Sequence, residues 1–478
     1  MADDRYPDGL IVVVKRDCPT CVLVEPVLAE LNADPQSLTV YTQDDLAFPA
    51  VPTPTDDREL RASYELGVTI VPTLIRRRDG AEVGRAEGWE RSEWVELSGV
   101  ASLGAALPQL RPGCGSLSVE PRNAERLAAR HGNLLHARRV EFGDEEDPFE
   151  ALYARGWSDG LPVIPPTPER VVRMLAGTTR DPQEVIATVP PNLAPCSVEK
   201  VAVNAVMAGC LPEYLPVVLA AVEAACSEPF AMHGLLATTM PHGPVVIANG
   251  PYARRIGINS GGNALGQGHR ANATIGRALN LVVRNVGGGR PGEVDRSCLG
   301  SPAKVGMCFA EAETDSPWES LAVERGFAQT ASTVTVFAGE GPRVVVDQLS
   351  RDPESLVTSF AQCMKTQCHP KLPLAFDTVL VVSPEHARVF REAGWDKTRL
   401  RAELGERLML AGEDIVRGAH GMAEGVPAVL KDATLPKFRP EGILIVHAGG
   451  GAGLFSAIIG GWVNGEMGSN PVTMEVRE

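Results

Sequence analysis

Two cysteines near the N-terminus have the types and the spacing of a redox pair. Cys18 and Cys21 enclose Pro19 and Thr20, and the apolar run 10–14 precedes them. A C-x-x-C at the junction of a strand and a helix most often forms a reversible disulfide. The N–H groups and the dipole at a helix start stabilise a thiolate, so we expect the pKa of Cys18 to fall from about 8.5 toward about 7 or below. Cys18 is then the attacking thiolate, and Cys21 resolves the mixed disulfide.

Two other interpretations of this pair stay open, a metal site and a pair of inert core residues. A zinc site needs about four ligands, and no second C-x-x-C or H-x-x-H pair lies nearby, so we assign no metal. Inert cysteines usually lie on an apolar stripe, whereas Cys18 stands between Asp17 and Pro19 at an element boundary. Thiol–disulfide chemistry is therefore the favoured interpretation.

The next hundred residues alternate strand and helix patterns. Proline belongs in a strand only at an edge, a start or a bulge, and a cis bond before Pro72 would explain its place in an apolar strand. Pro19 falls in the first helical turn, where its missing N–H costs nothing. The spacing of apolar and turn residues predicts a helix after Cys18, a strand over 37–41, a helix over 57–66, a strand over 69–75, a hairpin turn at Asp79-Gly80, a strand over 82–86 and a helix over 90–100.

This series resembles the thioredoxin superfamily over residues 8 to about 106, about a fifth of the chain. The resemblance rests on the C-P-T-C motif, on Val71-Pro72-Thr73 and on the Asp79-Gly80 turn. It implies that Cys18 is the nucleophile and Cys21 the resolving thiol. It also implies that a cis Pro72 packs against the disulfide and that the Val71 backbone pairs with the substrate chain.

Two departures from general thioredoxins narrow the implied role. The site is D-C-P-T-C, close to the C-P-x-C form of glutaredoxins, and Val12 stands where general thioredoxins bury an acid. A dedicated partner is therefore favoured over a general thioredoxin role.

Composition bounds the class of protein and its partners. The chain has 478 residues, 44% of them apolar and 22% charged, which predicts about two to three ordinary globular domains. The net charge of −15 disfavours nucleic acid and anionic membranes as partners. The acidic N-terminus is unlike a signal peptide, and no segment reaches the about 20 apolar residues of a membrane span. We therefore expect a cytoplasmic protein whose ten cysteines mostly stay reduced.

A segment rich in proline and glycine, 107–115, predicts a boundary or hinge around Cys114. Cys114 is either a third redox relay on a mobile arm or an incidental loop cysteine. We expect a thioredoxin-like domain over 1–106, a linker with a helical segment over 107–147, and a large domain over 148–478, with one or two subdomains.

The large domain alternates helices with apolar strands, which predicts an α/β fold with a mixed sheet. Helices are expected over 197–210, 214–226 and 270–284, and strands over 243–248, 332–337, 343–346, 378–382 and 443–446.

The first of three glycine-rich segments in this domain, 259–272, leads directly into the helix predicted over 270–284. His269, Arg270 and Asn272 converge there, and a helix start with basic side chains suits a carboxylate or phosphate. These three residues are candidate substrate-binding residues. The alternative is a long turn whose helix is capped by Asn272 or Thr274.

The second segment, 287–298, ends at Cys298, which lies two residues after Arg296. A cationic neighbour lowers a thiol pKa, so Cys298 is a candidate catalytic or substrate-linked thiol, although Arg296 can equally pair with Asp295. Cys368, next to His369, is the second candidate thiol, and a local pair of this kind is not by itself a metal site.

The third segment, 449–453, follows the strand predicted over 443–446 and precedes the apolar run 454–462. Strand, glycine loop and helix would be the order of a nucleotide-binding loop. Leu454 replaces the third glycine, however, and the P-loop lysine is missing. We predict an anion-binding or tight-packing turn and assign no nucleotide or other cofactor. Ser197 begins an S-x-x-K pattern, which a helix cap explains better.

A second resemblance concerns the large domain. The segment 155–163, R-G-W-S-D-G-L-P-V, resembles uncharacterised bacterial proteins associated with U-G-S-C-motif selenoproteins. The U-G-S-C motif itself is missing, and the resemblance implies no activity.

The favoured hypothesis is a thiol–disulfide oxidoreductase whose N-terminal domain supplies electrons to the large domain. The substrate is a small anionic or thiol-linked compound. A thiol or a reductase returns the N-terminal domain to its reduced state. The donor would reduce a thiol of the large domain, Cys298 first and Cys368 second, or a substrate bound there. The alternatives are a lyase or hydrolase that the first domain only keeps reduced, and a redox-sensing binding protein. Homo-oligomerisation stays open.

Overall fold

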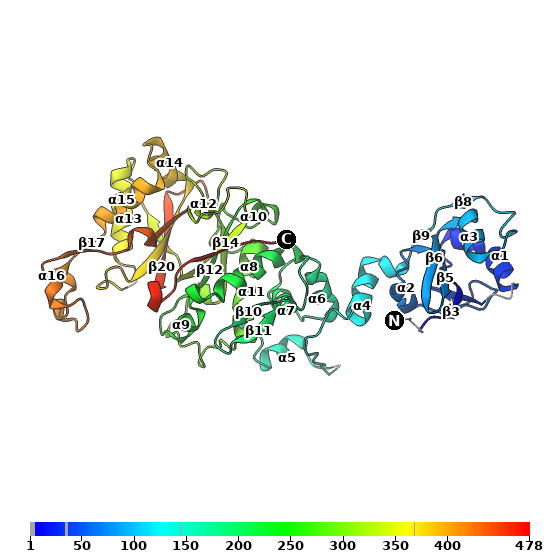
Figure 1. Ribbon diagram of the computed structural model, residues 1–478. Coiled ribbons are helices and arrows are strands. Elements are labelled where there is room, and N and C mark those ends of the chain that lie inside the picture. The colour runs from blue at the N-terminus through cyan, green and yellow to red at the C-terminus, as the bar shows by residue number, and fades with distance from the viewer. Residues whose placement is uncertain (1–4, 34–36, 144, 368) are drawn as a thin grey trace. The chain divides into compact units, whose positions relative to one another are not determined.

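The chain folds into two compact units, Met1–Leu135 and His136–Glu478 (Figure 1). The computed structural model describes all residues except 1–4, 34–36, 144 and 368. Helices and strands occur in both units, and the main sheet of each unit mixes parallel and antiparallel pairs, so the predicted α/β class is confirmed.

The first unit is built on a five-stranded sheet of order β3-β2-β1-β5-β6. In it β1 pairs in parallel with β2 and antiparallel with β5, which places the end of β1 and the start of α1 in the middle of the sheet. The sheet strands are β1 (Gly9–Val14), β2 (Leu38–Thr42), β3 (Thr55–Asp56), β5 (Thr73–Arg78) and β6 (Ala81–Glu87). The helices are α1 (Pro19–Ala33), α2 (Arg61–Glu65), α3 (Arg91–Ser98) and α4 (Pro121–His131).

Helix α2 is shorter than the helix predicted over 57–66. The Asp57 carboxylate accepts hydrogen bonds from the N–H groups of Ala62 and Ser63, and Leu60 has a φ of 61°. Residues 57–60 therefore form a turn that precedes the helix.

Two short strand pairs attach a later segment to this unit. β4 (Ile70–Val71) pairs with β9 (Cys114–Gly115), and β7 (Trp89–Glu90) pairs with β8 (Leu110–Arg111). The segment predicted as a hinge is thus held in the first unit, which continues through α4 to residue 135 rather than ending at 106.

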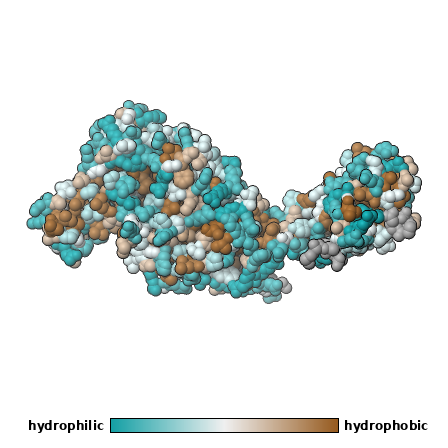
Figure 2. Space-filling model, in the orientation of Figure 1, coloured by the Kyte–Doolittle hydropathy of each residue, from teal (hydrophilic) through white to brown (hydrophobic). Residues whose placement is uncertain are grey.

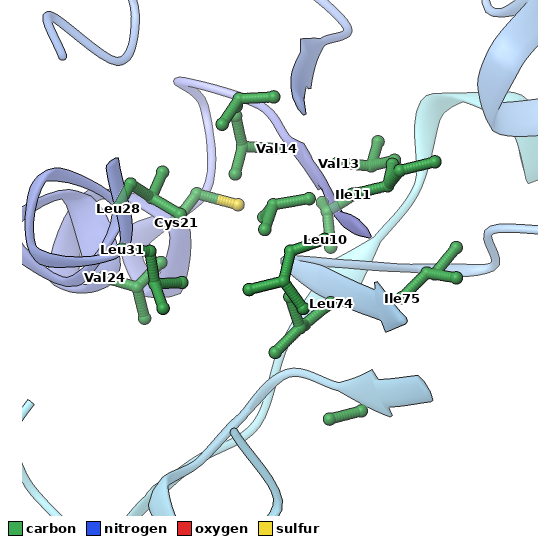
Figure 3. Close-up of a cluster of buried hydrophobic side chains, with 14 of the residues drawn as sticks. Leu10, Ile11, Val13, Val14, Cys21, Val24, Leu28, Leu31, Leu74 and Ile75 are labelled. Carbon is green, nitrogen blue, oxygen red and sulfur yellow. The ribbon is translucent and has the colours of Figure 1, made fainter. Parts of the chain in front are cut away.

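The core of the first unit lies between the sheet and α1. Strand β1 is buried along its whole length after Gly9, because both of its faces are covered. Figure 3 shows side chains from β1, β5 and α1 meeting there, with the sulfur of Cys21 directed toward β1. Burial of this apolar surface fixes the start of α1 against the end of β1.

The second unit contains an eight-stranded mixed sheet of order β13-β12-β14-β20-β16-β19, with β15 paired to β20 and β21 paired to β14. Its strands are β12 (Gly243–Asn249), β13 (Met307–Ala310), β14 (Thr333–Gly339), β15 (Arg343–Val346), β16 (Phe376–Val382), β19 (Ile443–His447), β20 (Phe455–Val463) and β21 (Val472–Glu475). Two small strand pairs lie outside it, β10 (Val185–Val189) with β11 (Ala194–Ser197) and β17 (Met409–Ala411) with β18 (Thr434–Pro436).

Twelve α-helices accompany this sheet in the described part of the second unit. They are α5 (Pro148–Ala154), α6 (Pro168–Leu175), α7 (Val198–Ala208), α8 (Leu215–Ala225), α9 (Met232–Ala237), α10 (Pro251–Arg255), α11 (Arg270–Asn285), α12 (Leu321–Glu324), α13 (Pro353–Lys365), α14 (Pro384–Glu392), α15 (Lys397–Arg407) and α16 (Gly412–Ile415). Leu380 and Val382 of β16 pack in the core formed with α13, α14 and α15, while Val379 and Val381 pack in the core around β12.

Most predicted elements of this unit are present. Helices α7, α8 and α11 and strands β12, β14, β15, β16 and β19 lie within two residues of their predicted bounds. Ser197 caps α7 by accepting a hydrogen bond from the N–H of Lys200, as predicted. The implied helix after the loop 449–453 is wrong, because the apolar run that follows is strand β20, between β14 and β16.

In the described part of the chain, no single helix is long and apolar enough to span a membrane. Only the bent pair 212–225 and 228–237, at 73° to each other, is long and apolar enough when its two members are taken together. Figure 2 shows polar residues over much of the visible face of each unit, with hydrophobic residues gathered near α16, where Val429 is 87% exposed.

Candidate functional site

Cys18 occupies the cap position of α1. Its carbonyl oxygen accepts the first helical hydrogen bond, from Val22 N at 3.1 Å, and its Sγ lies 3.4 Å from the backbone N of Cys21. Pro19 takes the next position, where no N–H is required. The sulfur of Cys18 therefore replaces the oxygen of an ordinary capping side chain and meets the positive end of the helix.

The strand end at Val71 approaches the same sulfur. Cys18 Sγ lies 3.5 Å from the carbonyl oxygen of Val71, and the Val71–Pro72 peptide bond is cis, as the sequence predicts. Cys21 lies deeper, with its Sγ 3.5 Å from the backbone N of Lys15. Val71 and Pro72 are thus next to the C-x-x-C pair.

A third cysteine completes the site. Cys114 on β9 lies directly opposite Val71 in the β4–β9 pair, and Val71 is the residue whose carbonyl oxygen lies 3.5 Å from the sulfur of Cys18. Cys18 is only 1% exposed, whereas Cys114 is partly exposed. Cys18, Cys21 and Cys114 are all free thiols.

The segment that carries Cys114, residues 110–116, is named the strap below. It is held by polar contacts along its length. Thr20 Oγ1 donates to Pro112 O at 2.6 Å, Lys15 Nζ donates to Gly115 O at 2.8 Å, and Ser116 N donates to Thr69 O at 2.9 Å. The strap thus covers the start of α1 and the end of β4.

Two glycines allow the strap to lie this close. A Cβ on Gly113 would stand 2.7 Å from Val71 O and 2.3 Å from the Ile70 side chain. A Cβ on Gly88, which has a φ of 77°, would stand 2.8 Å from the backbone N of Gly113. Contacts under 3.0 Å are essentially never made by real Cβ atoms, so the close approach requires glycine at both positions.

The three thiols have different acidities. The pKa of Cys18 is lowered to about 5, first by the hydrogen bond from the Cys21 thiol, against the opposing effect of burial, and further by the Cys114 thiol and by backbone N–H groups. Burial, and next the neighbouring Cys18 sulfur, raises the pKa of Cys21. The hydrogen bond to Cys18 also raises the pKa of Cys114. Cys18 therefore has the most acidic of the three thiols.

Within the residues that the structure describes, no group of three His, Cys, Asp or Glu side chains is placed to hold a metal ion. The chemistry open to the site is nucleophilic attack by one sulfur on another, with a second thiol in contact to displace the product.

The second unit scatters the residues that the sequence predicts as its site. Cys298 is exposed, with its backbone N bonded to Thr239 O at 2.9 Å. His269 is exposed, and Arg270 donates from Nε to Gly209 O at 2.8 Å. Asn272 is buried and bonded to Asn259 and to Ala264 O, so its side chain braces the loop 259–268. Cys368 lies outside the described residues.

A cavity of about 430 Å³ lies where two of the glycine loops meet. Gly449 N donates to Ser260 O at 2.8 Å, and residues 263–266 and 448–450 line the cavity together with Ser383 and Ser456. Its size is that of a small-molecule site. Ser383 is 8% exposed, and its buried Oγ has no hydrogen-bond partner.

Ser456 in the same wall is hydrogen-bonded to a buried histidine. Its Oγ lies 2.8 Å from His386 Nδ1, and His386 Nε2 lies 3.0 Å from the carbonyl oxygen of Asp347. A carbonyl oxygen only accepts, so Nε2 carries the proton. Burial lowers the pKa of His386, which favours the neutral ring, and Nδ1 therefore accepts a hydrogen bond from the hydroxyl of Ser456.

A second cavity, of about 250 Å³, lies beside the same glycine loop. Asp315, Arg388 and His447 are among its lining residues. His447 Nδ1 is bonded to Ala312 O, whereas its buried Nε2 has no partner. Both cavities thus lie at the carboxyl ends of the parallel strands β16 and β19, where Val382 is paired with His447.

The sequence indicates Cys18, Cys21, Val71 and Pro72 as site residues and leaves Cys114 as either a third redox relay on a mobile arm or an incidental loop cysteine; the structure instead holds Cys114 in a strand opposite Val71. The sequence signal for this position of Cys114 is the extended segment Gly-Cys-Gly. Its glycines leave a strand edge without bulky side chains next to the thiol. Ser456 and His386, which lie 70 residues apart, carry no local signal.

Comparison with known proteins assigns no family to this chain. No family model matches it, and no curated protein and no solved structure matches it either.

Proposed function

We propose that the first unit is a thiol–disulfide oxidoreductase of the thioredoxin superfamily and that it supplies electrons to the second unit. The Cys18 thiolate attacks a disulfide sulfur, a mixed disulfide forms at Cys18, and the other half of the substrate leaves as a thiolate. Cys21 then attacks Cys18 and releases the second half, leaving a Cys18–Cys21 disulfide that a thiol or reductase reduces.

The observation that carries this proposal is the environment of Cys18. A sulfur at a helix start, hydrogen-bonded by the N–H of Cys21 and with its pKa lowered to about 5, is a thiolate at neutral pH. The order of elements, the C-P-T-C motif and the cis Val71–Pro72 bond support membership of the superfamily. The departures at Asp17 and Val12 favour a dedicated partner within the same chain, where tethering gives an effective concentration of about millimolar.

The pH dependence of Cys18 alkylation tests this thiolate. Reduced full-length protein is treated with iodoacetamide at pH values from about 4 to about 9, a range that includes the ordinary thiol pKa of about 8.5. Modification of the Cys18 peptide is followed by mass spectrometry. We expect a rate that is constant above about pH 6 and half-maximal near pH 5, because the pKa of Cys18 is lowered to about 5.

Replacement of Cys21 by alanine removes the largest cause of that lowering, so the midpoint of the profile is expected to move to higher pH. A wild-type profile that rises only near pH 8.5, like that of an ordinary thiol, would contradict the proposed function.

A second candidate function belongs to the second unit, which we propose to be a hydrolase of a small carbonyl compound. The hydrogen bond from Ser456 to neutral His386, at the wall of the 430 Å³ cavity, favours it. In the attack, Ser456 Oγ bonds to the carbonyl carbon and its proton passes to His386 Nδ1. Protonated His386 returns this proton to the leaving group, and water later releases the acyl group.

Labelling with a fluorophosphonate probe tests this second function. We expect covalent modification of Ser456 in the full-length protein and complete loss of this label in Ser456→Ala. Ser383→Ala is the matched control, since Ser383 lines the same cavity without a histidine partner, and it should keep the label. An unlabelled Ser456 in the native protein would rule the hydrolase out.

A further inference from the structure

We propose that Cys114 is a third redox-active cysteine, which forms a disulfide with Cys18, and that the strap is a built-in substrate strand. This inference rests on the proposed function of Cys18 and deepens it. It identifies Cys114, opposite Val71, as an internal thiol partner of Cys18.

The placement of the sulfurs gives the first argument. Cys18 Sγ lies 3.4 Å from the backbone N of Cys21 and 3.5 Å from the carbonyl oxygen of Val71, the residue that Cys114 faces across the β4–β9 pair. Cys21 is completely buried, whereas Cys114 is partly exposed. Each of the two can therefore attack a sulfur bonded to Cys18, and Cys114 does so from the side on which a bound substrate would lie.

The backbone gives the second argument. Val71 lies at the end of a two-residue strand, and the strap pairs with it in antiparallel register, Val71 opposite Cys114 and Ile70 opposite Gly115. Gly113 allows contact with Val71 O that a larger residue would prevent. The strap is therefore paired with a strand edge in the way that an extended, cysteine-containing peptide would be, which is a common mode of peptide recognition. While the strap is paired with Val71, an external peptide cannot pair with this strand end.

The chemistry balances without an unnamed reactant. An external disulfide R–S–S–R is attacked by the Cys18 thiolate, which forms Cys18–S–S–R and releases one thiolate. Cys114, after losing its proton to solvent, attacks the Cys18 sulfur and releases the second thiolate. Two protein thiols are oxidised to one disulfide, and one external disulfide is reduced to two thiols. The resulting Cys18–Cys114 bond fixes the strap on Val71 until a thiol reduces it.

A trapping experiment with the full-length chain tests this step. The probe is glutathione disulfide, applied to the reduced Cys21→Ser variant and to the double variant Cys21→Ser/Cys114→Ser, and the Cys18 peptides are analysed by mass spectrometry. In the single variant we expect the Cys18 peptide to become linked to the Cys114 peptide. Its transient glutathione adduct should decay at a rate that does not depend on added thiol. In the double variant the glutathione adduct on Cys18 should persist.

The outcomes separate this inference from the proposed function. A stable glutathione adduct on Cys18 in both variants would overturn the role of Cys114 and leave exchange at Cys18 intact. No adduct on Cys18 in the double variant would remove the proposed function and this inference with it. Because both variants keep the residues that anchor the strap, Thr20, Lys15 and Ser116, a lost crosslink cannot be attributed to a lost anchor.

Discussion

Replacement of Gly113 by valine is expected to raise the alkylation rate of Cys18 at least about tenfold. The new Cβ would stand 2.7 Å from Val71 O and 2.3 Å from the Ile70 side chain, so the strap must move away from β4. A buried thiol reacts only through local opening, and a tenfold rate corresponds to about 1.4 kcal/mol less opening free energy. The measurement is the iodoacetamide rate at Cys18 in the full-length protein at pH 7, a value about two pH units above the pKa of Cys18.

Gly115→Val is the matched control for this experiment. It places the same side chain two positions along the same segment, where a Cβ would have nothing within 4 Å. Its alkylation rate should stay close to that of the native protein. Equal rates in Gly113→Val and Gly115→Val would show that the strap does not limit access to Cys18.

Loss of Cys18 is expected to abolish the transfer of electrons to the second unit. The protein is loaded with glutathione at Cys298, which is exposed, and the adduct is followed by mass spectrometry while a limiting dithiol is supplied near pH 6. In the native chain we expect Cys18 to attack the glutathione sulfur and free the Cys298 thiolate. Cys21 or Cys114 then releases the glutathione. A tethered thiolate at about millimolar effective concentration should outpace the free dithiol at least about tenfold, and Cys18→Ser should lose this advantage.

Cys363→Ser serves as the control, because Cys363 on α13 contributes nothing to the three-thiol site and is only partly exposed. It should keep the native rate. If the Cys298 adduct decays equally fast in Cys18→Ser and in the native protein, the two units do not exchange electrons through Cys18. Thiol chemistry at Cys18 itself would remain as proposed.

Local patterns in the sequence were sufficient for most elements of the fold. The strong apolar period of residues 270–284 predicts α11, and the run Arg343–Val346 is observed as β15 with unchanged bounds. The run 454–462 was misassigned because a strand buried on both faces has no alternation that separates it from a buried helix. The β-branched Ile458 and Ile459 and the pair Gly460-Gly461 were its strand signals. A Cβ on Gly461 would stand 2.5 Å from Asp377 O.

The candidate site was predictable only where its chemistry is local. Cys18 and Cys21 belong to one helical turn, so their relation follows from spacing. The position of Cys114 depends instead on the pairing of β9 with β4, a contact between segments far apart in the sequence. A proline-rich and glycine-rich segment also has two physical outcomes, a free hinge or a segment packed tightly against a neighbour. Only the tertiary structure, in which Gly88 and Gly113 meet, selects the second.

The burial of Cys21 bears on oxidative damage. Its sulfur is directed toward β1 among hydrophobic side chains (Figure 3), and the residue is 0% exposed. Conversion of a thiol to a sulfinic acid adds two oxygens and a negative charge, which a close-packed hydrocarbon interior does not accommodate. Over-oxidation of Cys21 itself is therefore disfavoured. The Cys21 thiol would remain available through many cycles of oxidation and reduction.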